Sequence, residues 1–280
     1  MQSLATADLG VGIVTAFAIH PSLVGYWPYG DLACRILGGF WTTFCGVSVL
    51  SLVSISIERF LAIAFPLRYH TLVTVRRCII VIGLLWVVNI SLSVFFVTRT
   101  DPAFYSYSSG AFMCLPGCLG DDCSMHLSPG SAIYVIIPCL ILPCIYISIM
   151  FVARKHRRKI SGRESSISQG PSTGTTRGNA DTSTRVEGRV RRNFRAAKIT
   201  CVVTGVFYLS WLPLATRTFI SISGVDVSPQ AEFITTWLAF ANSLWNFIIY
   251  TVMSKCFRST IARGFVRVCK RKTYVEEFSY

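Results

Sequence analysis

The chain has 280 residues, of which 52% are hydrophobic and only 14% are charged, and these proportions exclude an ordinary soluble domain. The formal net charge of +14 is compatible with nucleic-acid binding, but Lys and Arg gather in alternate loops between long apolar runs. Membrane proteins distribute positive charge in this way. The sequence therefore predicts a polytopic membrane protein without a nucleic-acid partner.

Six apolar runs are long enough to cross a hydrocarbon core of about 30 Å as helices that rise about 1.5 Å per residue. They are residues 4–20, 36–57, 78–98, 131–153, 199–216 and 233–254. The basic loops 66–77 and 154–198 and the basic tail from Lys255 are expected in the cytosol. The sequence therefore predicts an all-α fold, a polytopic membrane helix bundle of six spans with both termini inside.

The first run contains a carboxylate, Asp8. A lone intramembrane charge is costly and indicates a functional site, although a structural hydrogen bond to a neighbouring helix is the alternative. Ser48 in the second run and Asn242, Ser243 and Asn246 in the last run are its candidate partners. Together these oxygen-bearing side chains could hold a small hard cation such as sodium, or a proton with water.

The second run carries one stripe of side chains at steps of three or four, which is the spacing of a helix face. The stripe is Trp41, Cys45, Ser48, Leu52, Ile55 and Arg59. It ends at the pair Glu58-Arg59, followed by Phe60, at the predicted cytoplasmic face. We expect a signal to pass along this stripe from one membrane face to the other.

Cys34 lies at the outer mouth of the second run, where a disulfide is permitted. The outer loop 99–130 offers Cys114, Cys118 and Cys123, and we expect one of them to pair with Cys34. The sequence leaves open which one, because four cysteines allow three connectivities. A zinc site that adds Asp121, Asp122 and His126 is the alternative, although the spacing is not a paired CxxC pattern.

The later runs contain prolines, and Pro213 is expected to kink the fifth of the six spans just beyond Phe207 and Trp211. Between the fourth and fifth spans, residues 160–188 are rich in Ser, Thr and Gly and are predicted to be disordered. Residues 1–254 form the predicted membrane domain. Residues 255–280 are predicted to form an amphipathic helix on the inner leaflet and a cytoplasmic tail.

Several motifs, in this order and spacing, resemble those of rhodopsin-like (class A) G-protein-coupled receptors. They are Leu4-Ala5-Thr6-Ala7-Asp8, Glu58-Arg59-Phe60, Trp86, Pro138 with Tyr146, Ser210-Trp211-Leu212-Pro213 and Asn246-Phe247-Ile248-Ile249-Tyr250. In the same order, the family has at these places its second-helix motif, the Asp-Arg-Tyr motif, a tryptophan in the fourth helix and a Pro and Tyr pair in the fifth helix. The last two correspond to the family motifs Cys-Trp-x-Pro and Asn-Pro-x-x-Tyr. The resemblance starts at the family's second helix, so we expect the first to be lacking, through an incomplete gene model or fragment or through a natural truncation.

The resemblance implies roles for the matching positions. Arg59 would engage a heterotrimeric G protein, with Glu58 as its resting counter-charge. Tyr146 and Tyr250 would swing toward it on activation, while Trp211 and Phe207 would couple a ligand pocket to the helix rearrangement. The Asp8 cluster would be a sodium site. Phe247 departs from the family proline, which removes a kink and is expected to alter the movement of Tyr250.

The resemblance places the ligand pocket between the outer halves of the helices. The residues expected there are Trp41, Thr42, Cys45, Trp211, Thr218 and Trp237. Trp41 stands where amine receptors of the family have an aspartate, which disfavours a monoamine and leaves a small molecule or a peptide as ligand. Packing alone is the alternative role of these aromatic residues.

The resemblance implies a plasma-membrane receptor with a cytoplasmic C-terminus and no enzymatic activity. Its implied partners are a G protein, an extracellular ligand, the lipid bilayer, receptor kinases and arrestin. The alternatives are a truncated receptor that does not signal and an ion-coupled transporter. A transporter would show internal repeats, which the sequence lacks.

Overall fold

The computed structural model describes residues 2–66, 68–99, 105–116, 138, 140–152, 154, 177–254, 258–259 and 263. Of residues 99, 177–194 and 222 it describes the backbone alone. Cys118, Cys123, residues 131–137 and nearly all of the 255–280 segment lie outside this part of the chain. The predictions made for them, including the amphipathic helix, are untested.

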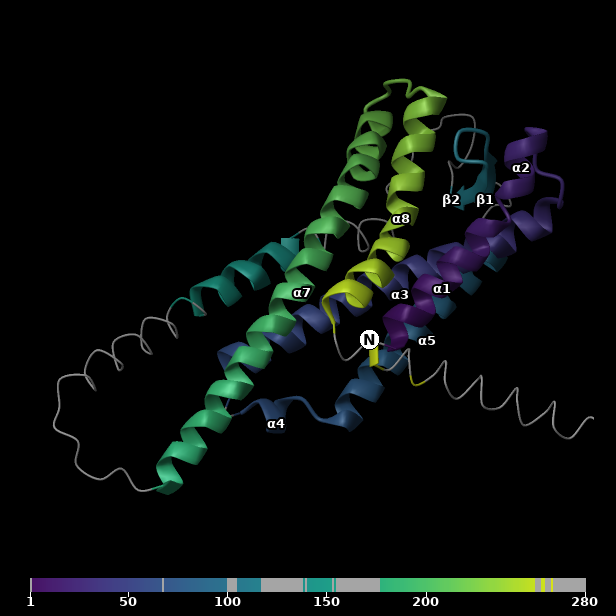
Figure 1. The fold of residues 1–280 in the computed structure, drawn as a ribbon. Helices are drawn as coiled ribbons and strands as arrows, with labels where there is room; N and C mark the ends of the chain where they lie inside the picture. The colour runs from purple at the N-terminus through teal and green to yellow at the C-terminus, as the bar shows by residue number, and fades with distance from the viewer. Residues whose placement is uncertain are drawn as a thin grey trace, which may run out of the picture.

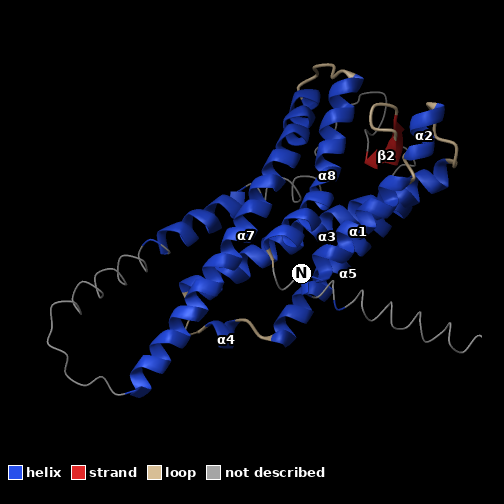
Figure 2. Ribbon diagram, viewed as in Figure 1, coloured by secondary structure: helices blue, strands red, loops and turns tan. Residues whose placement is uncertain are grey.

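The described part of the chain is a bundle of helices with one small hairpin (Figures 1 and 2). The elements are α1 (Gln2–Ala16), α2 (Ile19–Val24), α3 (Asp31–Ala64), α4 (Tyr69–Leu72), α5 (Val75–Arg99), β1 (Tyr105–Ser108), β2 (Met113–Pro116), the helix Leu140–Val152, α7 (Arg177–Ile222) and α8 (Pro229–Met253). The predicted fold class, an all-α membrane bundle, is confirmed.

Four helical segments of the described chain are both long and apolar enough to cross a membrane: Gln2–Val24, Asp31–Ala64, Val75–Thr98 and Arg195–Ser221. Helix α8 is as long as α5, at 25 residues each, and corresponds to the predicted span 233–254. The apolar helix Leu140–Val152 is the described portion of the predicted span 131–153.

The central helix of the bundle is α3, which packs against α1, α5 and α7 and against both strands of the hairpin. Helix α8 packs along α7 and also contacts α1. Buried side chains from α1, α3, α7 and α8 form one continuous apolar core that includes Leu52, Val203 and Phe207. Helix α5 contributes little to this core, so most of its surface is left for lipid.

Two predicted boundaries were wrong. The first predicted span was expected to end at residue 20, but α2 continues to Val24 before Gly25 adopts a positive φ of 79°. Pro21 is tolerated because it lies in the first turn of α2, where backbone N–H groups lack helical partners. Residues 177–188 were expected to be disordered, but α7 already begins at Arg177. Extending an existing helix adds one hydrogen bond per residue and needs no new nucleus.

The hairpin is the one sheet of the described chain, and the sequence did not predict it. Strands β1 and β2 pair antiparallel, with Tyr105 opposite Pro116 and Ser108 opposite Met113. Between them, Phe112 has a positive φ of 57°, and its backbone N–H donates to the Ser108 carbonyl. The hairpin lies over the outer end of α3, near α2 (Figure 1).

Candidate functional site

The C-terminal part of α3 carries an ion pair between adjacent residues. Arg59 Nε lies 2.9 Å from Glu58 Oε2, and the two side chains are 26% and 22% exposed. The Tyr69 hydroxyl, from α4, donates to the other carboxylate oxygen, Glu58 Oε1. Burial and the bond to Glu58 raise the pKa of Tyr69 to about 12, so this donor is protonated at neutral pH. Arg59 is therefore held in an ion pair by the adjacent Glu58, at a position that is partly exposed to solvent.

Tyr146 joins three helices one turn further into the bundle. Its hydroxyl lies 3.1 Å from Ser56 Oγ on α3 and accepts a hydrogen bond of 3.1 Å from Thr204 Oγ1 on α7. Phe60 and Tyr146 both pack against a second apolar cluster, which contains Ile63, Ile145, Ile149 and Ala197. Ser56 and Thr204 were missed in the sequence, because neither belongs to a recognisable motif and only the fold brings them together.

Asp8 is the centre of a polar cluster inside the bundle. Ser48 Oγ donates to Asp8 Oδ1 over 2.7 Å, and Asn246 Nδ2 donates to Asp8 Oδ2 over 3.1 Å. Ser243 also lies within reach of this carboxylate. Asn242 is buried one turn before Asn246 in α8, and the side-chain oxygens of both asparagines lack a hydrogen-bond partner. Ser48, Ser243 and Asn246 thus come together around Asp8, and the buried side-chain oxygens of Asn242 and Asn246 lack a partner.

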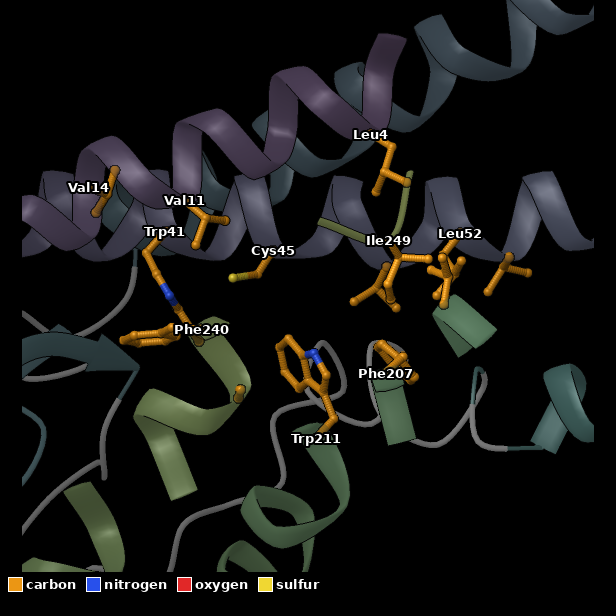
Figure 3. Packing of buried hydrophobic residues seen from close by; sticks show 14 of the residues in the cluster. Leu4, Val11, Val14, Trp41, Cys45, Leu52, Phe207, Trp211, Phe240 and Ile249 are labelled. Carbon is orange, nitrogen blue, oxygen red and sulfur yellow. The ribbon is translucent and has the colours of Figure 1, made fainter. Parts of the chain in front are cut away.

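Aromatic side chains fill the outer half of the core (Figure 3). Trp41 meets Phe240 edge to face with ring centroids 5.3 Å apart, and Trp237 meets the same Phe240 at 5.7 Å. Deeper in the bundle, Phe207 and Trp211 stack with centroids 5.9 Å apart, and Cys45 faces the space between Trp41 and Trp211. Phe240 was missed in the sequence, where it is one of many apolar residues of the last span.

Two indole donors in this region are buried without a hydrogen-bond partner, Nε1 of Trp41 and Nε1 of Trp211. Buried N–H groups normally have partners, so an orphaned donor needs an explanation such as a bound acceptor. Thr42 Oγ1, by contrast, donates to the Gly38 carbonyl and accepts from the Tyr105 hydroxyl at 3.2 Å. Thr218 is half-buried on α7. The residues predicted to line a ligand pocket thus include aromatic side chains with two unpartnered indole donors, and their role in binding stays a prediction.

The hairpin covers this aromatic region from outside and is joined to the helices at several places. A disulfide joins Cys34 of α3 to Cys114 of β2, which resolves the connectivity that the sequence left open. At the other side, Trp237 Nε1 donates to the Ala111 carbonyl over 3.2 Å. Because Cys114 is in a disulfide, the zinc alternative loses one of its three thiols, and its other proposed ligands lie outside the described residues.

A polar latch, defined here as Ser108, Arg217 and Glu232, ties the hairpin to the outer ends of α7 and α8. Ser108 Oγ donates to Glu232 Oε1 over 2.6 Å, and Arg217 Nη1 lies 3.4 Å from the same oxygen. The Arg217 Nε atom is buried and has no hydrogen-bond partner. The latch was missed in the sequence because its members are separated along the chain and belong to no motif.

Of the other switch residues, Tyr250 lies in the apolar core. It is buried in the main cluster, which also contains Leu52 and Ile249. Pro213 lies inside α7, which continues as a helix to Ile222. Position 247, where the predicted motif departs from proline, is a half-exposed Phe247 within the uninterrupted helix α8.

The comparisons with known proteins agree with this geometry. The model of the family "7 transmembrane receptor (rhodopsin family)" matches residues 1–250. The chain is 30% identical over 275 residues to the human probable G-protein coupled receptor 21, covering 94% of this chain and 72% of that protein. It is 28% identical over 267 residues to the zebrafish (Danio rerio) trace amine-associated receptor 13c, covering 94% and 74%.

Among solved structures, squid rhodopsin shares the fold. The superposition has a TM-score of 0.75 at 21% sequence identity and covers 95% of this chain and 74% of the rhodopsin chain.

Proposed function

This chain belongs to the rhodopsin family of seven-transmembrane receptors, and on that premise we propose that it binds an extracellular ligand and activates a heterotrimeric G protein through a helix rearrangement around Arg59. The observation that carries the proposal is the Glu58–Arg59 pair at the inner end of α3. Arg59 needs to lose only one partly exposed ion pair to reach a partner, and such pairs contribute little free energy.

A column of packed side chains runs from the outer aromatic region toward the Glu58–Arg59 pair. Trp41, Cys45, Trp211, Phe207 and Leu52 belong to one buried cluster, so a ligand that displaces Trp41 or Trp211 meets side chains in direct van der Waals contact. Close-packed cores transmit displacement because they have few voids. A ligand that prefers one packing of this column over another would shift the receptor between states by that difference in affinity.

The ligand that we propose is a small molecule or a peptide side chain with hydrogen-bond acceptors and an apolar body. Its acceptors would take the free indole donors of Trp41 and Trp211, and aromatic rings would cover the rest. One relative is named for trace amines. We propose a different ligand class for this chain, because the nearby carboxylate of the latch, Glu232, is already engaged by Ser108 and Arg217.

The Asp8 cluster is proposed to hold sodium as a modulator. The carboxylate and the unpartnered oxygens of Asn242 and Asn246 are hard oxygen donors of the kind that bind alkali and alkaline-earth cations. Such an ion would link α1 to α8 through residues that already bond to each other. We further propose that the receptor resides in the plasma membrane with its C-terminus in the cytosol, where receptor kinases and arrestin have access to it.

The test is guanine-nucleotide exchange on a panel of G proteins, in membranes that contain either the wild-type chain or Arg59→Ala. The matched control is Arg76→Ala, because Arg76 is an exposed arginine at the same membrane face. The proposal expects exchange on at least one G protein that is lost in Arg59→Ala and kept in Arg76→Ala. Exchange that is equal in all three chains would refute it, and surface-expressed protein without any exchange would favour a non-signalling receptor.

A further inference from the structure

A groove between the outer halves of α7 and α8 lies outside the receptor site described above. It has a volume of about 660 Å³, and none of the predicted ligand-pocket residues lines it. Its wall runs along α7 from Gly205 and Leu209, past Pro213, to Arg217, and reaches Asp226 at the outer end. Volumes of about 300–1,000 Å³ are typical of small-molecule sites.

The groove opens toward lipid. Leu209 and Leu212, which line it, are 73% and 54% exposed in the isolated chain, and both lie on a helix that is apolar enough to span the membrane. From Gly205 to Arg217 the helix rises roughly 18 Å at about 1.5 Å per residue. One leaflet of a hydrocarbon core of about 30 Å is roughly 15 Å deep. The apolar part of the groove therefore matches the depth of one leaflet.

The outer end of the groove carries charge of both signs. This end is extracellular, because the same segment of α8 bonds to the disulfide-linked hairpin through Glu232. Arg217 lines the groove, and its buried Nε donor has no partner, while its Nη1 is shared with Glu232. Asp226 lines the groove from the exposed loop 223–228, and no ion pair holds it among the described residues.

We propose that this groove binds a zwitterionic phospholipid of the outer leaflet. The phosphate diester accepts from Arg217 Nε, the choline-type ammonium lies toward Asp226, and one acyl chain fills the apolar part down to Gly205. A simple anionic lipid would satisfy Arg217 but would face the uncompensated carboxylate of Asp226, which costs free energy. The two charges at the outer end of the groove and the length of its apolar part therefore both favour a zwitterionic phospholipid.

The bound lipid would press against the middle of α7. Pro213 lines the groove, and a proline inside a helix removes a backbone hydrogen bond at the point where the helix is easiest to bend. An acyl chain at this position would act on the side of α7 opposite to the stacked pair of Phe207 and Trp211. A lipid bound in the groove would therefore affect the bending of α7, the helix that the proposed receptor mechanism also moves.

The experiment measures lipid retained by the full chain in detergent by native mass spectrometry, with oleoyl lysophosphatidylcholine and oleoyl lysophosphatidylglycerol as probes. The wild-type chain should bind the choline lipid about tenfold more tightly, a factor typical of one favourable contact with a charged group. Asp226→Asn should remove this preference. Arg217→Gln should weaken both probes.

Gly205→Leu provides a variant that blocks the groove without disturbing the fold, because nothing lies within 4 Å of a Cβ added at Gly205. Gly83→Leu is its matched control, since Gly83 on α5 is equally open and lies outside the groove. The proposal expects loss of the choline lipid in Gly205→Leu alone, with thermal midpoints in both glycine variants that are no lower than that of the wild-type chain. Equal binding of the two probes, full binding by Gly205→Leu, or equal losses in both glycine variants would overturn it. None of these readouts involves a G protein.

Discussion

At the scale of single residues, Glu58 is bound by two partners that have different consequences when removed. Arg59 pairs with Oε2, while Tyr69 donates to Oε1. Glu58→Gln removes the ion pair and should raise basal nucleotide exchange by about 1.5- to 5-fold, because a partly exposed pair contributes about 0.2–1 kcal/mol. Exchange assays at matched surface expression measure this rise.

Tyr69→Phe serves as the comparison. It keeps the charge pair and removes one hydroxyl donor, so its effect on basal exchange should be smaller and in the same direction. Basal exchange in Glu58→Gln at or below the wild-type level would contradict the assignment of Glu58 as the resting counter-charge.

The carboxylate of Asp8 offers a second test at a single position. Asp8→Asn preserves the shape of the side chain but removes the negative charge, and it replaces one of the two oxygens that accept from Ser48 and Asn246 with an NH2 donor. The wild-type chain should unfold at a higher temperature in sodium chloride than in choline chloride, since a ligand at ten times its dissociation constant stabilises by about 1.4 kcal/mol. The variant should show no such difference. A sodium shift of equal size in both chains would place the ion elsewhere.

The residues around Asp8 show how far a sequence can predict such a site. A carboxylate within an apolar run is unusual enough to indicate a function, and Ser48 and Asn246 were identified because polar residues are few in the spans. Helical spacing puts Asn242 and Asn246 on one face, and both are buried. The latch had no comparable signal, because Ser108, Arg217 and Glu232 lie near the membrane surface, where polar residues are common.

At the scale of elements, the hairpin is held at one side by a disulfide and at the other by the latch. Ser108→Ala and Glu232→Ala each remove the hydrogen bond between them, so in a double-mutant cycle their effects should be non-additive by about 1 kcal/mol. Thermal unfolding of the four chains gives this coupling. Additive effects would show that the contact does not stabilise the folded hairpin.

The packing of α3 against α5 depends on a glycine. A Cβ on Gly39 would come within 2.8 Å of Ser93 Oγ and of Val97 Cγ2, closer than real contacts allow. Gly39→Ala should therefore destabilise the chain by about 1–3 kcal/mol, the usual cost of overpacking. Unfolding in denaturant or by heat measures the loss.

Gly83→Ala is the control for this substitution. Position 83 also lies in a helix, but nothing surrounds the added Cβ, so the higher helix propensity of alanine should stabilise by about 0.5–1 kcal/mol. Stabilisation by both substitutions would mean that α3 and α5 are less tightly packed than this structure shows.

The helices were predictable to different degrees. Residues 36–57 were recognised because charge is absent from them, yet α3 extends from Asp31 to Ala64, since a helix continues into the interface as long as its backbone bonds are satisfied. The hairpin was missed although Tyr105-Ser106-Tyr107-Ser108 alternates aromatic and polar residues, a strand pattern. Four residues are too few for such a pattern to stand out in a loop.

At the scale of the whole molecule, two independent features orient the bundle in the membrane. The disulfide between Cys34 and Cys114 marks one end as the oxidising, extracellular side. Arg68 lies between α3 and α4, and Arg76 and Arg77 lie in the first turn of α5, all at the opposite end, where the positive-inside rule places basic residues. The two features agree on the same orientation.

This orientation predicts which segments antibodies reach on living cells. An epitope inserted after Gly224, in the turn between α7 and α8, should be labelled on intact cells, because that turn is at the disulfide end. The same epitope inserted within residues 160–176 should be labelled only after permeabilisation, because the arginine-rich flanks of this loop resist transfer across the membrane. Labelling of both insertions on intact cells would contradict the predicted topology, and with it the placement of Arg59 at the cytosolic face where a G protein could bind.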